Sequence, residues 1–129
     1  MERPSLDAWM KEAKAAPGAE NCGMFLFHNG VVRATAKAQV RENTPFPAVC
    51  SLELSYDRER VEKVVAAARD MPGILYARVW INEGTLRVGD DMMLVLVGGD
   101  IRPHVVDALQ TLVGELKTNC VTEKEQFNL

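Results

Sequence analysis

The chain of 129 residues has 15 Lys and Arg against 18 Asp and Glu, and this net charge of −3 disfavours a broad surface for nucleic acid or anionic membranes. With 47% hydrophobic and 26% charged residues, the chain can bury a core without disulfides or metals, which predicts one domain over residues 1–129. Three distant cysteines, no secretory signal and no apolar run of 18 residues predict a cytoplasmic protein without a membrane span.

The first half of the chain alternates helix-like and strand-like segments. Residues 5–16 predict a helix that begins at the N-cap Ser5 and stops at Pro17-Gly18. Residues 22–28 form an apolar run of strand length. Residues 31–48 contain few large apolar side chains and predict a long loop, a kind of segment that often carries function.

The second half predicts the remaining sheet and two more helices. Residues 49–56, 74–81 and 92–97 are predicted strands, with residues 82–91 as a connection and residues 95–97 at the centre of the sheet. A helix follows Asp57, and a longer one runs from Asp100 to about residue 119. The pattern does not predict the secondary structure of residues 120–129, a polar tail. It indicates an α+β fold with a mostly antiparallel sheet and about three helices.

Common catalytic motifs are absent. The chain has no GxGxxG or GxxxxGK[ST] loop and no GxSxG elbow, which disfavours nucleotide binding by those motifs and hydrolase triads. His28 and His104 lack metal-ligand spacing, so no metal is expected and each histidine is predicted to be structural or exposed. Gly98-Gly99 before a helix would suit an anion beside Arg102, but a plain strand-to-helix turn is the more ordinary interpretation.

Four cations lie near the ends of the predicted elements: Arg33, Arg102, Lys117 and Lys124. Each alone is most often a surface charge. Arg33 follows Gly30-Val31-Val32 on the way out of a buried strand, and from this position a guanidinium can reach over the sheet edge to a phosphate or carboxylate. Together the four cations indicate a local site for an anionic substrate.

Over about residues 5–125 the chain resembles the catalytic large subunit family of molybdopterin synthase, because these cations lie in short motifs with the spacing that this family has. That family has the pattern GxVR, HRxGxLxxGD, HR, LK and WK(K/R)E, in an α/β hammerhead fold. The matching residues here are Arg33, Gly84, Leu86, Gly89, Asp90, Arg102, Lys117 and Lys124.

The chain lacks the histidines and the tryptophan of the family pattern. Ile81-Asn82 and Ile101-Arg102 stand where the family has His-Arg, and Glu123 stands where it has tryptophan. His104, two residues after Arg102, is the candidate to replace the second histidine.

The resemblance implies sulfur transfer without a cofactor. A ubiquitin-like small subunit brings a C-terminal Gly-Gly thiocarboxylate, and the large subunit uses its sulfur to convert cyclic pyranopterin monophosphate into molybdopterin. By resemblance, Lys117 is the main catalytic lysine and Lys124 a second, while Arg33, Arg102 and His104 bind substrate.

A helix that runs from Arg102 to Lys117 separates these two residues by roughly 22 Å. They can share one site only if two subunits contribute, which predicts a homodimer. The resemblance implies that this homodimer binds the small subunit within a heterotetramer. Two alternatives stay open: a non-catalytic family member that binds a ubiquitin-like carrier or an anion, and an enzyme of the same fold that acts on another phosphorylated small molecule.

Overall fold

The structure, a computed structural model, describes residues 2–43 and 45–127. Within these residues the strands form two three-stranded sheets, and all neighbouring strands are antiparallel. The first sheet has the order β1-β5-β3, with bounds Met24–Val31, Asp91–Gly99 and Ile74–Ile81. The second has the order β4-β2-β6, with bounds Gly84–Arg87, Val49–Tyr56 and Val121–Phe127. Residues 1, 44, 128 and 129, which the predicted domain includes, lie outside the described residues.

The described part of the chain contains four α-helices, whereas the sequence predicted about three. Their bounds are Leu6–Ala15 for α1, Lys37–Glu42 for α2, Arg58–Arg69 for α3 and Arg102–Glu115 for α4. The additional helix is α2, inside the segment predicted as a loop over residues 31–48. A 3₁₀ turn η1 (Ala19–Asn21) follows α1, and a π-helical turn η2 (Leu116–Cys120) continues α4.

The predicted N-caps of α1 and α3 are confirmed. The hydroxyl oxygen of Ser5 accepts the N–H of Ala8 at 3.1 Å, and the carboxylate of Asp57 accepts the N–H of Arg60 at 3.1 Å. Each bond satisfies one of the backbone donors that an isolated helix leaves free in its first turn.

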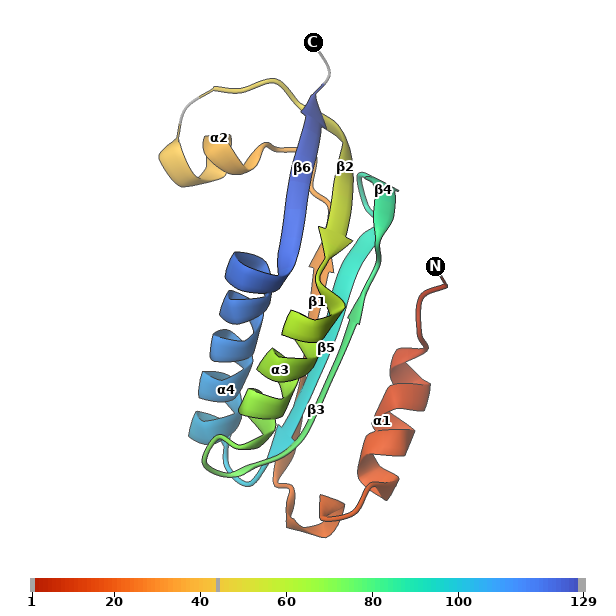
Figure 1. Cartoon of the computed structure of the whole chain (residues 1–129), viewed down its shortest axis with the longest axis vertical. Coiled ribbons are helices and arrows are strands. Elements are labelled where there is room, and N and C mark those ends of the chain that lie inside the picture. Colours follow the sequence, from red (N-terminus) through yellow and green to blue (C-terminus); the bar gives the residue numbers. More distant parts are fainter. Residues whose placement is uncertain (1, 44, 128–129) are drawn as a thin grey trace.

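Both faces of the first sheet are covered, as Figure 1 shows. Helices α3 and α4 pack on one face, where Val95 and Val97 of β5 lie in the larger core. Helix α1 covers the other face, where Trp9 packs against Leu94 and Leu96. Because of this double cover, residues 92–99 are all buried, which confirms the predicted central position of residues 95–97.

Long-range pairing explains where the structure differs from the sequence-based expectation. Residues 84–87, predicted as part of a connection, form β4 because they pair with residues 51–54 of β2. Residues 121–127, which the sequence left open, form β6 on the other side of β2. A second sheet therefore extends from the first, with α2 beside β6 at one end of the molecule (Figure 1). In the described residues, no helix has both the length and the hydropathy needed to span a bilayer.

Candidate functional site

A cavity of about 210 Å³ lies where the two sheets meet. We call it the junction cavity. The end of β1, the start of α2, the turn η2 and strands β2, β5 and β6 all contribute to it. Its lining residues are Gly30, Val31, Val32, Arg33, Lys37, Leu52, Met92, Lys117, Glu123 and Glu125.

Two of the predicted site residues, Arg33 and Lys117, line this cavity together. The chain at the end of β1 is fixed by Val32, whose N–H donates to Asp90 O at 3.0 Å and whose carbonyl accepts Gly89 N–H at 2.8 Å. Next along the chain, Arg33 donates from Nε to the carbonyl oxygen of Thr35 at 3.1 Å. The structure thus brings together two cations from the end of β1 and the end of the α4 segment.

The fully buried Leu116 anchors the turn that carries Lys117. Helix α4 passes into the π-helical turn η2 at this residue, and Lys117 directly follows it with an exposed side chain. Single π-turns of this kind often occur at functional sites, because they alter the direction of side chains near a helix end.

Three further charged residues line the junction cavity, and the sequence analysis did not propose any of them as a site residue. The ammonium of Lys37 lies 3.4 Å from a carboxylate oxygen of Glu123, whose side chain is only 9% exposed. The backbone N–H of Lys37 donates to Glu125, with Oε2 at 3.1 Å and Oε1 at 3.3 Å. The cavity therefore holds three cations and two carboxylates, so its positive charge is partly compensated from within.

Lys124 lies on the other face of the second sheet. Along β6, Glu123 and Glu125 face the junction cavity, and side chains alternate between the two faces of a strand. Lys124 instead lines a separate depression of about 310 Å³ next to Glu53 and Gly84. The structure does not bring the second predicted catalytic lysine to Lys117. The sequence shows three charged residues in a row at 123–125, but only the placement of β6 shows which of them face the junction cavity.

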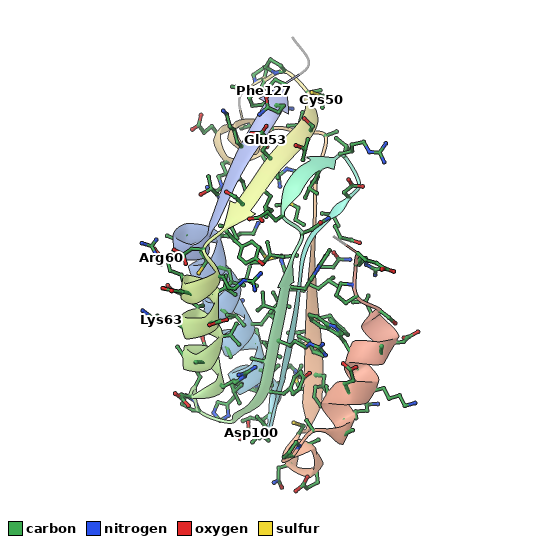
Figure 2. All side chains as sticks on the ribbon, turned by 45° about the vertical axis from the view of Figure 1, so that its right-hand side comes forward. Cys50, Glu53, Arg60, Lys63, Asp100 and Phe127 are labelled. Carbon is green, nitrogen blue, oxygen red and sulfur yellow. The ribbon has the colours of Figure 1, made fainter. Side chains whose placement is uncertain are left out.

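Arg102 and His104 lie at the far end of α4 from Lys117. Arg102 begins this helix and is exposed, and His104 Nδ1 lies 2.7 Å from Asp100 Oδ1. Figure 2 shows Asp100 at one end of the molecule and Phe127 of β6 at the opposite end. The predicted separation of Arg102 and Lys117 is consistent with this geometry, and neither Arg102 nor His104 lines the junction cavity.

The start of α4 differs from an open anion site. Gly98 and Gly99 belong to β5 and are buried, and a Cβ on Gly99 would lie 2.6 Å from the carbonyl oxygen of Gly73. The carboxylate of Asp100 accepts the N–H of Ile101 at 2.6 Å. Its contact with His104 is the largest cause that lowers the pKa of Asp100. The glycine pair is therefore explained by close packing, and the chain's own carboxylate places a negative charge at this helix start.

His28 has the one buried side-chain nitrogen or oxygen without a hydrogen-bond partner among the described residues, its Nε2. Burial is the main cause that lowers the pKa of His28, and the nearby charge of Lys117 lowers it further. The prediction that His28 is structural or exposed gave it no connection to the cations. Only the structure relates His28 to the charge of Lys117.

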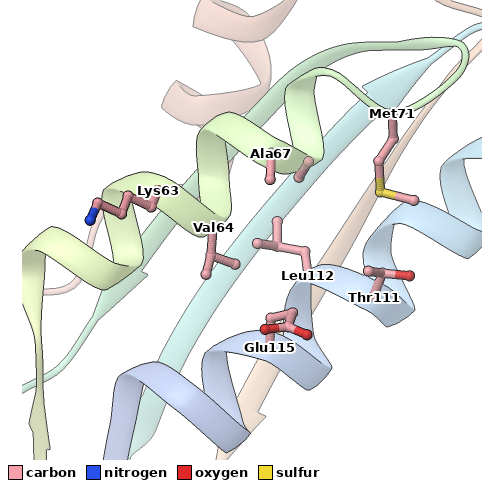
Figure 3. Close-up of a pocket in the computed structure, with 8 residues that line it drawn as sticks. Lys63, Val64, Ala67, Met71, Thr111, Leu112 and Glu115 are labelled. Atoms are coloured by element: carbon pink, nitrogen blue, oxygen red, sulfur yellow. The ribbon is translucent and has the colours of Figure 1, made fainter.

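A larger cavity of about 440 Å³ lies between α3 and α4. Figure 3 shows Val64, Ala67, Met71 and Leu112 around it, so its wall is mainly apolar. None of the five predicted site residues lines it. The described residues also contain no group of three or more His, Cys, Asp or Glu side chains arranged to hold a metal ion.

Comparisons with known proteins agree with this architecture. The structure is similar to that of molybdopterin synthase from Staphylococcus aureus, with a TM-score of 0.77 and 16% identity over 99% of this chain and 88% of that chain. It is also similar to the molybdopterin biosynthesis MoaE protein from Burkholderia ambifaria, with a TM-score of 0.74 and 20% identity over 98% of this chain and 84% of that chain. Another similar structure is a complex of subunits 1 and 2 of molybdopterin-converting factor from Helicobacter pylori, with a TM-score of 0.68 and 19% identity over 95% of this chain and 76% of that chain.

These low identities establish a common fold, and a family model provides the relationship. Comparison with curated protein sequences gives no significant match. The model of the MoaE protein family matches residues 2–119, a range that includes Arg33, Arg102 and Lys117 but ends before Lys124. This result confirms the resemblance found in the sequence. The chain belongs to the MoaE family, the catalytic large subunits of molybdopterin synthase.

Proposed function

We propose that this chain transfers sulfur from a thiocarboxylated, ubiquitin-like small subunit to cyclic pyranopterin monophosphate, and that the reaction takes place at the junction cavity. The observation that carries this proposal is the meeting of Arg33 and Lys117 in one cavity. Residues 1–129 then act as one MoaE-like domain, in the cytoplasm.

The two cations suit different parts of this reaction. The guanidinium of Arg33 offers a planar set of donors for a phosphate, and a phosphate bound at the cavity mouth would lie within its reach. Lys117 is exposed beside the cavity, where its amine can meet the terminal glycine carbonyl of the small subunit. In this assignment Arg33 binds substrate and Lys117 is the catalytic lysine.

A second copy of the chain supplies the remaining predicted residues in this proposal. Arg102 and His104 begin α4, and Lys117 lies beyond its end, so one copy cannot place all three residues around one substrate. A two-fold homodimer would bring the start of α4 from one copy to the junction cavity of the other. The complex of two subunits from Helicobacter pylori supports a small-subunit partner, which together with the proposed homodimer would form a heterotetramer.

One observation favours a second candidate function, a family member that binds a carrier or an anion without catalysis. Glu123 and Glu125 place two carboxylates in the junction cavity, where the family pattern has tryptophan and a basic residue. Lys124 also faces away from that cavity. Carboxylates next to Arg33 and Lys117 compete with an anionic substrate for these cations.

Reconstitution distinguishes the two functions. The purified chain is mixed with a thiocarboxylated small subunit and cyclic pyranopterin monophosphate, and molybdopterin is measured after oxidation to a fluorescent derivative. Formation of molybdopterin supports catalysis. No product, together with retained binding of the small subunit, supports the non-catalytic alternative. A carrier protein that ends in carboxylate in place of thiocarboxylate is the control for sulfur transfer.

A further inference from the structure

The buried Nε2 of His28 provides an observation that the proposed reaction does not use. His28 lies on β1 opposite the fully buried Val95 of β5. Its neighbours on the same face of β1, Met24 and Leu26, pack into the core beneath α3 and α4. A polar ring atom that is closed to water and lacks a partner costs free energy, so its retention in this position calls for a role.

The ring nitrogen lies directly behind the wall of the junction cavity. Gly30, two residues further along β1, lines that cavity, and a Cβ on Gly30 would lie 3.5 Å from His28 Nε2. Because glycine has no side chain, no group from this position covers the nitrogen. A donor that enters the cavity over Gly30 therefore comes close to Nε2, and a small shift of the adjoining side chains opens the nitrogen to it.

Lys117 is the donor that the structure offers. Lys117 lines the junction cavity together with Gly30, whose Cβ position lies 3.5 Å from His28 Nε2. In agreement with this placement, the charge of Lys117 lowers the pKa of His28, in addition to the larger effect of burial. The neighbours of His28 from β5 on this face, Met93, Val95 and Val97, are apolar. A neutral imidazole has one acceptor nitrogen, and an ammonium has only donors, so the two groups are complementary.

The other charged groups around the junction cavity have partners. Lys37 is paired with Glu123, Glu125 accepts the backbone N–H of Lys37, and Arg33 donates to the carbonyl of Thr35. Lys117 is exposed and extends from the short turn η2. Its long side chain can turn from solvent into the cavity without breaking any of these contacts.

We propose that His28 is a positioning residue for Lys117, with its imidazole Nε2 as the hydrogen-bond acceptor that holds the Lys117 ammonium against the wall of the junction cavity. The role in sulfur transfer rests on the proposed function, whereas the contact itself does not. The contact fixes the amine next to the small subunit's terminal carbonyl, and it satisfies the one buried atom that lacks a partner in the described residues.

The first test measures the contact between His28 and Lys117 and does not depend on enzymatic activity. The chain has two histidines, so NMR can follow the titration of both rings in the full-length wild type and in Lys117→Met. Loss of the cation is expected to raise the pKa of His28 and to shift its Nε2 resonance. His104 is the internal control, because it lies at the other end of α4. An unchanged His28 titration curve would overturn the proposal.

The second test measures the consequence for catalysis. In the reconstituted assay, His28→Phe is expected to lower kcat roughly tenfold with little change in KM, because the acceptor is lost while the volume is retained. His28→Gln keeps an acceptor oxygen and is expected to recover most of kcat, which a purely structural role would not produce.

Thermal unfolding of both variants ensures that they are compared as folded proteins. The values of kcat are compared when both His28→Phe and His28→Gln are folded, and the titration of Lys117→Met tests the contact independently of these two variants. Wild-type kcat in His28→Phe, or an equal loss in both variants, would overturn the proposal. Absence of product from the wild type would instead refute the proposed function, and the titration would still report on the contact.

Discussion

The carboxylate of Glu125 on β6 accepts the backbone N–H of Lys37, the first residue of α2, with Oε2 at 3.1 Å from the nitrogen. The residue before this helix, Ala36, has no side-chain oxygen and makes no cap. The long-range carboxylate therefore does what a local Ser or Asp does at other helix starts. In this way β6 holds α2 at the edge of the junction cavity, and Glu123 adds an ion pair to the Lys37 side chain.

Glu125→Ala is expected to loosen α2 while the rest of the fold persists. A charge-assisted hydrogen bond of this kind contributes about 1–3 kcal/mol, so backbone amides of α2 should exchange with deuterium at least several times faster. Glu53→Ala is the matched control, because Glu53 is an exposed strand glutamate that does not line the junction cavity. Unaltered exchange in α2 of the Glu125 variant would show that the bond does not fasten the helix.

Mixing two inactive variants tests the proposed homodimer. Lys117→Ala and Arg102→Ala each remove a different half of a shared site, so each alone should be nearly inactive. After subunits exchange at random, about half of the dimers are mixed and each contains one intact site, which predicts recovery of about a quarter of wild-type activity. No recovery after verified exchange would mean that each site belongs to a single copy.

The free energy of unfolding depends on pH through His28. Its pKa in the folded chain lies below 6.5, the ordinary value for histidine, because of burial and the charge of Lys117. The unfolded chain therefore binds a proton that the folded chain does not, and stability falls as the pH decreases through 6.5 towards the lower, folded pKa. His28→Gln should remove this dependence, seen by urea unfolding at pH 7.5 and 5.5. Equal pH dependence in wild type and variant would contradict this assignment.

Two glycines in neighbouring elements should respond to alanine in opposite directions. A Cβ on Gly99 of β5 would lie 2.6 Å from the backbone oxygen of Gly73, so Gly99→Ala should cost about 1–3 kcal/mol of stability. A Cβ on Gly114 of α4 meets nothing within 4 Å, and Gly114→Ala should stabilise by about 0.5–1 kcal/mol. Urea unfolding measures both changes, and a Gly99→Ala protein as stable as the wild type would refute the close approach.

Local patterns predicted much of the first sheet and its covering helices. Ser5 and Asp57 cap the helices that their sequence positions indicated, and the apolar run at residues 95–97 lies at the centre of β1-β5-β3. These features depend on side chains close in sequence or on complete burial, which periodicity reveals.

The second sheet could not be predicted in the same way. Residues 84–87 and 121–127 become strands through pairing with β2, and α2 is capped by Glu125 from the distant β6. Neither contact leaves a local signal. Arg33 and Lys117 were singled out as cations at element ends, with roles that the resemblance implied, and they lie together. The places of Lys37, Glu123, Glu125 and His28 at or behind the junction cavity became visible only when the two sheets were in place.

The most direct test of the catalytic assignment compares Lys117 with Lys124 in the reconstituted reaction. We expect Lys117→Ala to lower molybdopterin formation at least about a hundredfold with the fold intact, since Lys117 lies beside the junction cavity. Lys124→Ala should have a much smaller effect, because Lys124 lines the depression on the opposite face of β6. Near-wild-type activity in Lys117→Ala, or a greater loss in Lys124→Ala, would contradict catalysis at the junction cavity.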